Sequence, residues 1–366
     1  MSLLKNLFKA KDFPTQAYAN FWKWFRSNEH KFAELVRKGS DPAILQTEFF
    51  NVLSEKLSEI KEGFFYLAGM CDENTVELVF TPDGVIKNIV FVEELVAAAP
   101  HIKGWKFTAL KPALDIKDVG ISMGKYEFKP DNIFFYSNDH KEYPDEIDIT
   151  VVYEDMEEEN RPMLTNGVFI FLDNYLGELN LATKIDEIKI IGKTEAEGEL
   201  VPIIKLKPFL VWREKEFIER YEGHRYATAD DNHSMFEAIL ENGNPLTAII
   251  NTDLLKWENK ASHPWVMNIK IEYEPDIQGL PDKETYDLLN VLEDELESEL
   301  RDLEGYLNIG RETADGCRFI YFACQDFRLP SKVSHKISQK YKDRLAMDYS
   351  IYKDKYWQSF QRFVQY

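Results

Sequence analysis

The clearest pattern along the chain is the alternation of apolar and polar residues at 265–274, WVMNIKIEYE. Side chains at every second position share one face of a strand, so this segment predicts a half-buried β-strand. Residues 282–303 instead carry leucines at steps of three and four, separated by acidic residues. This spacing predicts an amphipathic helix with an apolar side toward the core and an acidic side toward solvent.

The remainder of the second half continues this pattern. Four further segments follow: a strand at 305–313, a strand at 317–325, a helix around 333–341 and a strand at 345–352. Asp315 and Gly316 separate the two neighbouring strands and favour the tight turn of a β-hairpin. The order over residues 265–352 is therefore βαββαβ, which is the order of the ferredoxin-like split βαβ unit.

The first half mixes helical and strand-like patterns. The expected elements are helices at 18–38, 42–60 and 88–100, strands at 64–70, 75–82, 104–110, 125–128, 133–138 and 147–153, an apolar run at 167–173, a helix-like segment at 174–182 and a strand at 185–191. They predict a mixed or antiparallel sheet with helices. Because 366 residues exceed the size of one ordinary core, we expect an α+β protein with two domains, an N-terminal α+β domain at 1–205 and a C-terminal ferredoxin-like sandwich at 206–366.

The net charge of −20 is unevenly distributed along the chain. Residues 1–40 and residues 331–366 each contain eight basic and three acidic residues, so residues 41–330 carry a net charge of −30. An acidic surface repels phosphate backbones, so we expect no direct nucleic-acid binding. The charge keeps the protein soluble, and it can also attract a basic protein partner.

The N-terminus, the apolar runs and the cysteines favour a cytoplasmic protein. Lysines at 5, 9 and 11 interrupt the apolar stretch that a secretory signal needs, and no apolar run approaches the length of a membrane span. The three cysteines, Cys71, Cys317 and Cys324, form no CxxC pair. We therefore expect reduced thiols, no disulfide framework, no thiolate zinc site and no membrane association.

The densest set of chemically active side chains is GHRYATADDNHS at 223–234, with His224, Asp230, Asp231 and His233. One interpretation is a helix start, in which Ser234 and Glu237 form a capping box for a helix that ends at Asn242-Gly243. The two aspartates would then be stabilised by the helix N-terminus.

The alternative interpretation of this loop is a metal or acid/base site in a hydrolase or metal-dependent enzyme. A metal site needs three or more converging ligands, and His224 and His233 are nine residues apart rather than the four that place two ligands on one helix face. We therefore favour the helix start and expect no cofactor.

Two further motifs lack the context that their chemistry requires. GISMG at 120–124 matches the GxSxG pattern of a nucleophilic serine, but the strand-like segment after Ser122 replaces the required helix. IGKT at 191–194 resembles the end of a phosphate-binding loop, but Glu187 occupies the position of the upstream glycine. Neither motif predicts an active site.

The C-terminal tail combines aromatic and basic residues beyond the last expected strand. Trp357, Phe360, Arg362 and Phe363 are the candidate interaction residues. The tail can pack back onto the acidic body of the protein, as docked chain ends do. It can alternatively form a docking element for a partner, because Trp, Tyr and Arg are common interface anchors.

The second half resembles a bacterial family of unknown function, DUF695, over about residues 210–352. The segments that carry this resemblance are NGNPLTAIINTDLL, HPWVMNIKIEY, QGLPDKE, the acidic helix and GRETADGCRFIYFAC. Such domains are often associated with a domain like the regulator of RNase E activity B, an acidic, non-catalytic, ferredoxin-like protein-binding module. The resemblance implies no catalytic residues. Together with the charge distribution and the catalytic motifs that lack their context, the resemblance favours a bacterial, non-enzymatic regulatory protein that binds a basic partner, such as a ribonuclease or a toxin.

Overall fold

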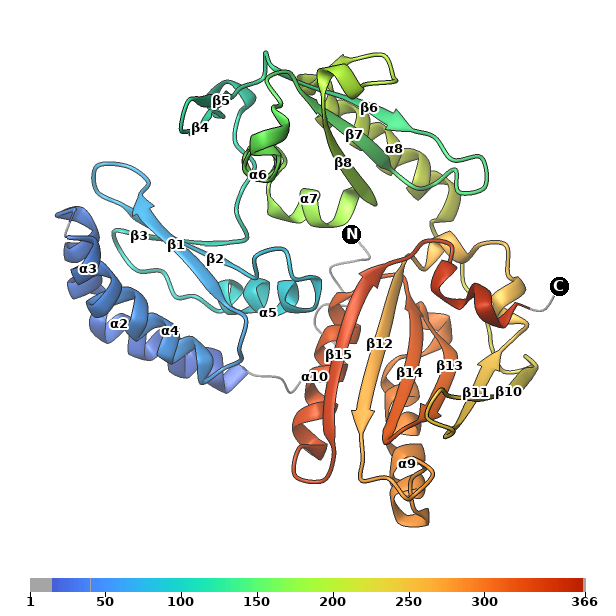
Figure 1. Ribbon diagram of the computed structural model, residues 1–366. Coiled ribbons are helices and arrows are strands. Elements are labelled where there is room, and N and C mark those ends of the chain that lie inside the picture. The colour runs from blue at the N-terminus through green and yellow to red at the C-terminus, as the bar shows by residue number, and fades with distance from the viewer. Residues whose placement is uncertain (1–14, 40, 365–366) are drawn as a thin grey trace. The chain divides into compact units, whose positions relative to one another are not determined.

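The computed structural model describes residues 15–39 and 41–364, which fall into two compact units, and the boundary along the chain lies between Glu216 and Phe217. Figure 1 traces both units, and helices and sheets are present in each, so the expected α+β class is confirmed. The first fourteen residues, whose lysines argue against a secretory signal, lie outside the described residues. Within the described ranges, no helix is both long and apolar enough to cross a membrane.

The first part of the N-terminal unit is a three-stranded sheet covered by helices. Its elements are α2 (Thr15–Arg37), α3 (Pro42–Leu45), α4 (Asn51–Ser58), β1 (Phe65–Met70), β2 (Val76–Thr81), α5 (Ile86–Ala97) and β3 (Trp105–Ala109). Strand β1 pairs antiparallel with β2, and α5 is the crossover between the parallel strands β2 and β3. The Trp22 indole on α2 donates to the Leu95 carbonyl of α5 at 2.7 Å and packs against Phe107. These aromatic contacts hold the helices on the sheet.

The second part of the N-terminal unit is built on a separate four-stranded sheet, so the structure contains two main sheets where the sequence predicted one. Its elements are β4 (Ile121–Met123), β5 (Tyr126–Phe128), β6 (Ile133–Asn138), β7 (Asp148–Tyr153), α6 (Arg161–Leu176), α7 (Glu178–Lys184), β8 (Glu187–Gly192), β9 (Val201–Pro202) and α8 (Leu206–Tyr221). The strand order is β8-β7-β6-β9, and β7 and β8 are parallel. The apolar run at 167–173 lies within α6, where Phe171 and Leu172 are fully buried.

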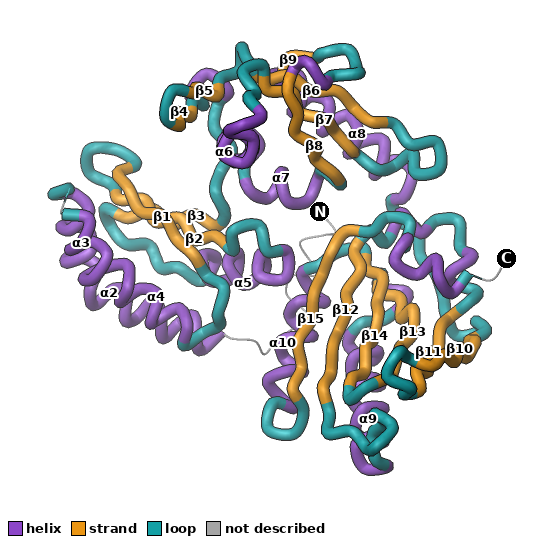
Figure 2. The backbone as a smooth tube through the Cα atoms, in the orientation of Figure 1, coloured by secondary structure: helices purple, strands orange, loops and turns teal. Residues whose placement is uncertain are grey.

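The C-terminal unit contains a six-stranded sheet with two long helices. Its elements are β10 (His233–Ile239), β11 (Pro245–Asn251), β12 (Trp265–Glu272), α9 (Lys283–Glu299), β13 (Tyr306–Ala314), β14 (Cys317–Cys324), α10 (Arg328–Tyr341) and β15 (Ala346–Lys353). The strand order, which can be followed in Figure 2, is β10-β11-β13-β14-β12-β15. Every neighbouring pair is antiparallel. Every element that the sequence predicted between residues 265 and 352 is present.

The two faces of this sheet pack against different parts of the chain. On one face, Met267 of β12 accepts a hydrogen bond from Ser334 of α10, and Arg318 of β14 contacts Asn290 of α9. Val266 points to the opposite face, because neighbouring residues of a strand alternate. There it belongs to an apolar cluster with Trp357 and Phe360 of the C-terminal tail. The sheet is therefore buried from both sides.

The helix predicted from Ser234 to Asn242 is wrong, because these residues form the edge strand β10. His233 to Ile239 pair in register with Asn251 to Pro245 of β11. Asn242 and Gly243 make the turn between the two strands, and Gly243 adopts a φ of 88°. Pairing with β11 and contact between Phe236 and Phe363 outweigh the local capping signal.

Candidate functional site

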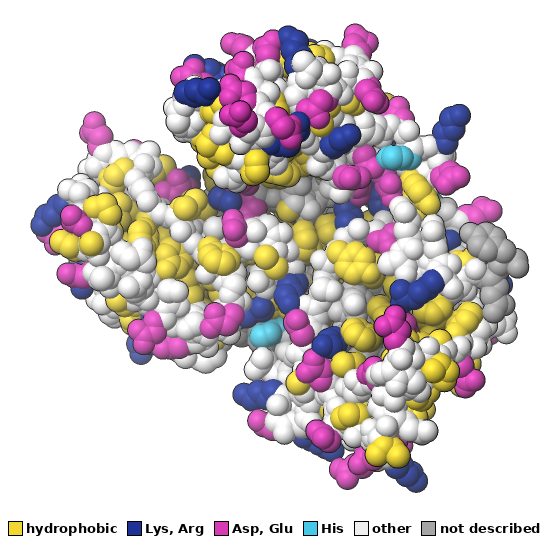
Figure 3. All heavy atoms as spheres, viewed as in Figure 1, with side chains coloured by type: hydrophobic (Ala, Val, Ile, Leu, Met, Phe, Trp, Pro, Cys, Tyr) yellow, Lys and Arg dark blue, Asp and Glu magenta, His cyan; other side chains and the backbone are white. Residues whose placement is uncertain are grey.

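An acidic surface lies at one edge of the four-stranded sheet. Strands β7 and β8 are parallel, with Tyr153 opposite Gly192, so the loops that follow them emerge at the same edge. These loops contain eight acidic residues, at positions 154, 155, 157, 158, 159, 195, 197 and 199. We call these eight residues the acidic edge, and Figure 3 shows acidic side chains gathered on the visible face of this part of the unit.

Ion pairs join the two loops of the acidic edge but leave much of its charge unbalanced. Arg161 bridges Glu158 at 2.5 Å and Glu195 at 2.8 Å, and Lys193 pairs with Glu154. Lys125 lies 3.2 Å from Glu157. Within residues 15–39 and 41–364, four exposed acids of the edge have no basic partner: Asp155, Glu159, Glu197 and Glu199. The edge is thus an ordered, solvent-facing surface of negative charge.

A second acidic site lies where β6 ends and β7 begins, at the other end of β7. A cavity of about 280 Å³ opens here, lined by Ser137, Asp139, His140, Pro144, Glu146, Phe209, Trp212 and Arg213. We call it the hairpin pocket. Arg213 of α8 donates to the Pro144 carbonyl at 2.6 Å and to the Glu146 carbonyl at 3.1 Å. The carboxylate of Asp186 accepts the Ile147 N–H at 2.7 Å. The loop between β6 and β7 is therefore fixed from two sides.

Three potential metal ligands converge beside the hairpin pocket. His140 Nε2 lies 2.7 Å from Asp148 Oδ2, and one ligand atom from each of His140, Glu146 and Asp148 lies within 4.8 Å of the other two. In the part of the chain that the structure describes, this is the one group of three or more such side chains. Asp148 is buried, and its burial raises the pKa of its carboxyl above the ordinary value; the charges of Asp186 and Glu187 add to the rise, while the hydrogen bond to His140 opposes it.

The sequence interpretation did not single out this group. The signal was present in DHKEYPDEID at 139–148, which has five acidic residues and one histidine. The sequence pattern places Asp148 in a strand, and His140 lies eight positions before it, so the pattern alone does not show that the two side chains are neighbours. Only the β6–β7 hairpin, which closes the intervening loop, brings the two side chains together.

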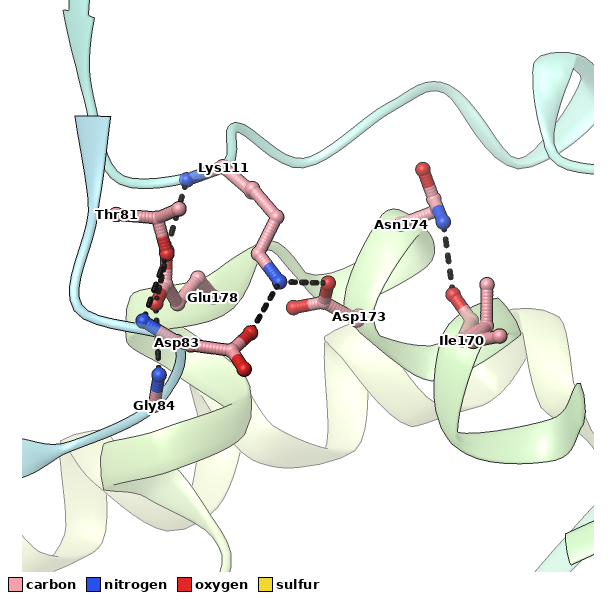
Figure 4. A network of polar contacts seen from close by, with 8 residues as sticks. All are labelled: Thr81, Asp83, Gly84, Lys111, Ile170, Asp173, Asn174 and Glu178. Atoms are coloured by element: carbon pink, nitrogen blue, oxygen red, sulfur yellow. Dashed lines mark hydrogen bonds and ion pairs between the residues drawn. The ribbon is translucent and has the colours of Figure 1, made fainter. Parts of the chain in front are cut away.

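The buried carboxylate of Glu178 is structural rather than reactive. Figure 4 shows that it accepts hydrogen bonds from the Thr81 hydroxyl, from the Gly84 N–H at 2.8 Å and from the Lys111 N–H at 3.0 Å. The Lys111 ammonium pairs with Asp173 at 2.8 Å. Desolvation opposes protonation of Lys111, but its acidic neighbours prevail and raise its pKa. The hydrogen bonds to Glu178 tie α7 to the end of β2 and to the segments that follow β2 and β3.

The candidate residues of the 223–234 loop do not form one site. Asp231 accepts hydrogen bonds from Tyr226 at 2.9 Å and Asn251 at 2.7 Å, so it fixes the loop. Asp230 and His233 are exposed, and His233 is the first residue of β10. His224 is partly buried, and its carbonyl accepts a hydrogen bond from Gln325. The four side chains therefore do not converge on one metal or acid/base site.

His224 instead lies close enough to influence another histidine, His263. The His263 side chain is fully buried, with Nδ1 hydrogen-bonded to Ser262 at 2.8 Å. Burial lowers its pKa to about 3, and the charges of Arg225 and His224 contribute to the decrease. Among the described atoms, His263 Nε2 and His224 Nδ1 are buried and have no hydrogen-bond partner. His263 is therefore neutral at physiological pH.

The aromatic residues of the C-terminal tail are internal to the C-terminal unit. Trp357, Phe360 and Phe363 are 2%, 1% and 6% exposed and belong to the apolar cluster on the sheet. Arg362 remains at the surface, where it forms an ion pair with Glu312. The structure therefore places the tail in the packed arrangement, and a partner could contact these three rings only after the tail had detached.

The basic residues near the C-terminus are paired largely with acidic residues of the same unit. On α10 and the loop after it, Lys336 bonds to Glu299 at 2.9 Å, Lys340 to Glu295 at 2.6 Å and Arg344 to Glu284 at 3.3 Å. All three acids lie on α9. Three acids of α9 are therefore paired with basic residues of the same unit.

The two weaker motifs remain without a catalytic context. Ser122 lies in the short strand β4, and Gly124 leads directly into β5 rather than into a helix. The IGKT segment ends β8, and a single turn at Lys193–Glu195 follows it. Neither arrangement presents a helix N-terminus to a substrate.

Comparison with known proteins identifies one domain. Residues 236–364 match the family model described as "Family of unknown function (DUF695)", so this part of the C-terminal unit is similar to that family. No curated protein matches the chain, and no solved structure does. The match runs from β10 to the tail, so the acidic edge and the hairpin pocket lie outside it.

Proposed function

We propose that this protein is a non-enzymatic interaction protein of the bacterial cytoplasm that binds a basic protein partner. The observation that carries the proposal is the acidic edge, where two parallel strands deliver eight acidic residues to one surface. Four of them are exposed and lack an ion pair among the described residues, so their charge is available to a partner. Such a surface accelerates association with a basic protein and fixes its orientation.

The pairing of the C-terminal basic residues supports the same proposal. Lys336, Lys340 and Arg344 pair with acids of α9, so the positive charge of these three residues is offset within the unit. A nucleic-acid binder needs a continuous basic surface that displaces counterions. The overall charge of −20 opposes such a role and favours a basic protein as the partner.

The proposal includes a ferredoxin-like architecture for residues 265–353. The element order β12-α9-β13-β14-α10-β15 and the strand order β13-β14-β12-β15 support it. Strands β10 and β11 extend this sheet at the β13 edge. A relationship to domains like the regulator of RNase E activity B would fit this arrangement and would make a ribonuclease one candidate partner, although a shared fold does not establish a shared function.

A charge-neutralised variant tests the proposed surface. The variant replaces the four unpaired acids of the edge: Asp155→Asn, Glu159→Gln, Glu197→Gln and Glu199→Gln. The control variant neutralises four exposed acids elsewhere: Glu55→Gln, Glu73→Gln, Glu241→Gln and Glu258→Gln. Both change the net charge equally, so only the position of the charge differs. The tagged full-length proteins are used to capture partners from native lysate at low and moderate salt, with identification by mass spectrometry.

We expect the wild type and the control to retain the same basic protein, and the edge variant to lose it. Raising the salt concentration should weaken retention, because exposed charges are screened. If all three proteins retain the same partner equally, the acidic edge is not the binding surface. If no basic protein is retained at either salt concentration, the proposed function is wrong.

A further inference from the structure

We propose that His140, Glu146 and Asp148 form a binding site for a divalent transition-metal ion, with Zn²⁺ as the best-fitting ion. This inference does not depend on the proposed partner, because the acidic edge lies at the other end of β7. The three ligand atoms lie within 4.8 Å of one another. Ligands bound to one zinc ion at about 2.1 Å lie within about 4.2 Å of each other, so small side-chain movements would complete the site.

The donor atoms determine which ion is suitable. One imidazole nitrogen and two carboxylate oxygens are ligands of zinc and neighbouring transition metals, whereas Mg²⁺ and Ca²⁺ prefer oxygen alone. A hydrogen bond of 2.7 Å now joins His140 Nε2 and Asp148 Oδ2, which places one proton between the two atoms. A bound ion would take the place of this proton, which would leave to solvent, and the imidazole would bind through its lone pair.

The surrounding structure holds the ligands in place. Glu146 lies between two fixed points, since Arg213 binds its carbonyl and Asp186 binds the N–H of the next residue. Asp148 begins β7 and pairs with Asn138, the last residue of β6. Ligands on a strand and a braced loop lose less conformational freedom on binding than ligands on a mobile loop.

The local charge also favours a cation. Asp148 is 6% exposed and lies within the fields of Asp186 and Glu187, and Glu146 adds a further carboxylate beside it. Arg213 already brings one positive charge to this pocket, and a divalent ion would balance the carboxylates further. His140 and Glu146 also line the hairpin pocket, so water or a small ligand in the pocket could complete the coordination.

Calorimetric titration of the chelator-treated, full-length protein with ZnCl₂ tests the site. Wild type should bind one equivalent that His140→Ala and Asp148→Asn each weaken at least about tenfold. The matched controls are His101→Ala and Asp131→Asn, which alter an exposed histidine and an exposed aspartate of the same unit. Both controls should bind zinc as the wild type does. The His140 side chain is 44% exposed, so its removal should leave the fold intact.

Two results would overturn the metal site. One is the absence of zinc binding by the wild type, and the other is equal binding by wild type and by His140→Ala. A parallel titration with MgCl₂ distinguishes coordination from general attraction of cations to an acidic surface. Mg²⁺ binding of similar strength that survives His140→Ala would show that charge alone is responsible, which also contradicts the proposal.

Discussion

The indole N–H of Trp357 donates to the main-chain carbonyl of His263 at 3.0 Å, which fastens the C-terminal tail to the segment before β12. The Trp357 ring is 2% exposed and lies 6.2 Å from the ring of Trp257. This contact joins residues that are far apart in the sequence and covers one face of the central sheet. The tail is therefore part of the C-terminal core.

Replacement Trp357→Ala should destabilise the C-terminal unit by about 3–5 kcal/mol, because it removes a large buried side chain and leaves a cavity. Lys342→Ala should change stability by less than about 1 kcal/mol, since Lys342 is exposed and lies away from the buried cluster. Hydrogen exchange of the β13 and β14 amides measures both effects in this unit. Equal protection of β13 and β14 in the Trp357 variant and the wild type would show that the tail is dispensable.

Two glutamates on α9 should differ strongly in their contribution to stability. Glu293 is 6% exposed in its side chain and lies 3.0 Å from Arg311 and 3.9 Å from the buried Arg318. Glu293→Ala would leave a buried guanidinium without its anion and should destabilise the unit by about 3–5 kcal/mol. Glu295 pairs with the exposed Lys340, so Glu295→Ala should have an effect below about 1 kcal/mol.

Urea unfolding of the C-terminal unit, followed by circular dichroism, compares these two variants directly. They remove the same charge from the same helix, so helix propensity and net charge are matched. If Glu293→Ala and Glu295→Ala lower the free energy of unfolding by similar amounts, the buried ion pair of Arg318 with Glu293 contributes no more to stability than an exposed ion pair.

The stability of the N-terminal unit should depend on both carboxylate oxygens of Glu178. Oε1 accepts from Gly84 and Oε2 accepts from Lys111, while Thr81 donates to the same group. Glu178→Ala should destabilise the N-terminal unit by about 3 kcal/mol, because the buried Thr81 hydroxyl and two part-buried N–H groups lose their acceptor. Glu178→Gln should be nearly as harmful, since its amide nitrogen would face a donor. The exposed Glu197→Gln serves as the control in thermal unfolding, and rescue by glutamine would contradict this account.

The helices and strands between residues 265 and 352 could be predicted because their local patterns and their packing agree. The alternation in β12 matches a strand whose Met267, Ile269 and Ile271 are fully buried. Asp315 and Gly316 adopt φ values of 48° and 73°, as the tight hairpin turn requires. Local sequence and tertiary structure favour the same conformation at each of these positions, so the sequence alone was sufficient.

The edge strand and the metal-type cluster were missed for different physical reasons. Ser234 and Glu237 carry a helix-capping signal, but pairing with β11 decides the conformation and that pairing is not local. His140 and Asp148 become neighbours only because the β6–β7 hairpin closes the loop between them. The 223–234 loop became a candidate site because of its composition. In the structure, Asp231 of this loop accepts hydrogen bonds from Tyr226 and Asn251 and so has a structural role. Proximity in sequence was a poor guide to proximity in the fold.

Asp148→Asn should have opposite effects on stability without and with zinc. Burial raises the pKa of Asp148 above that of an unfolded aspartate, so the folded state binds its proton more tightly and the charged carboxylate destabilises it at neutral pH. In chelator at pH 7, Asp148→Asn should therefore raise the melting temperature of the N-terminal unit. The gain should shrink as the pH falls toward the ordinary aspartate pKa of about 4, where the wild-type carboxyl becomes neutral.

With added Zn²⁺, the wild type should instead have the higher melting temperature. An ion that binds only the folded state stabilises it by mass action, and the Asp148→Asn variant lacks one of the ligands. Differential scanning calorimetry at pH 7, with chelator and with zinc, gives both comparisons, and the exposed Asp131→Asn is the control. If Asp148→Asn lowers the melting temperature in chelator, the hydrogen bond to His140 outweighs the penalty of burial. If the Asp148→Asn variant has the higher melting temperature both with and without zinc, Asp148 does not bind the ion.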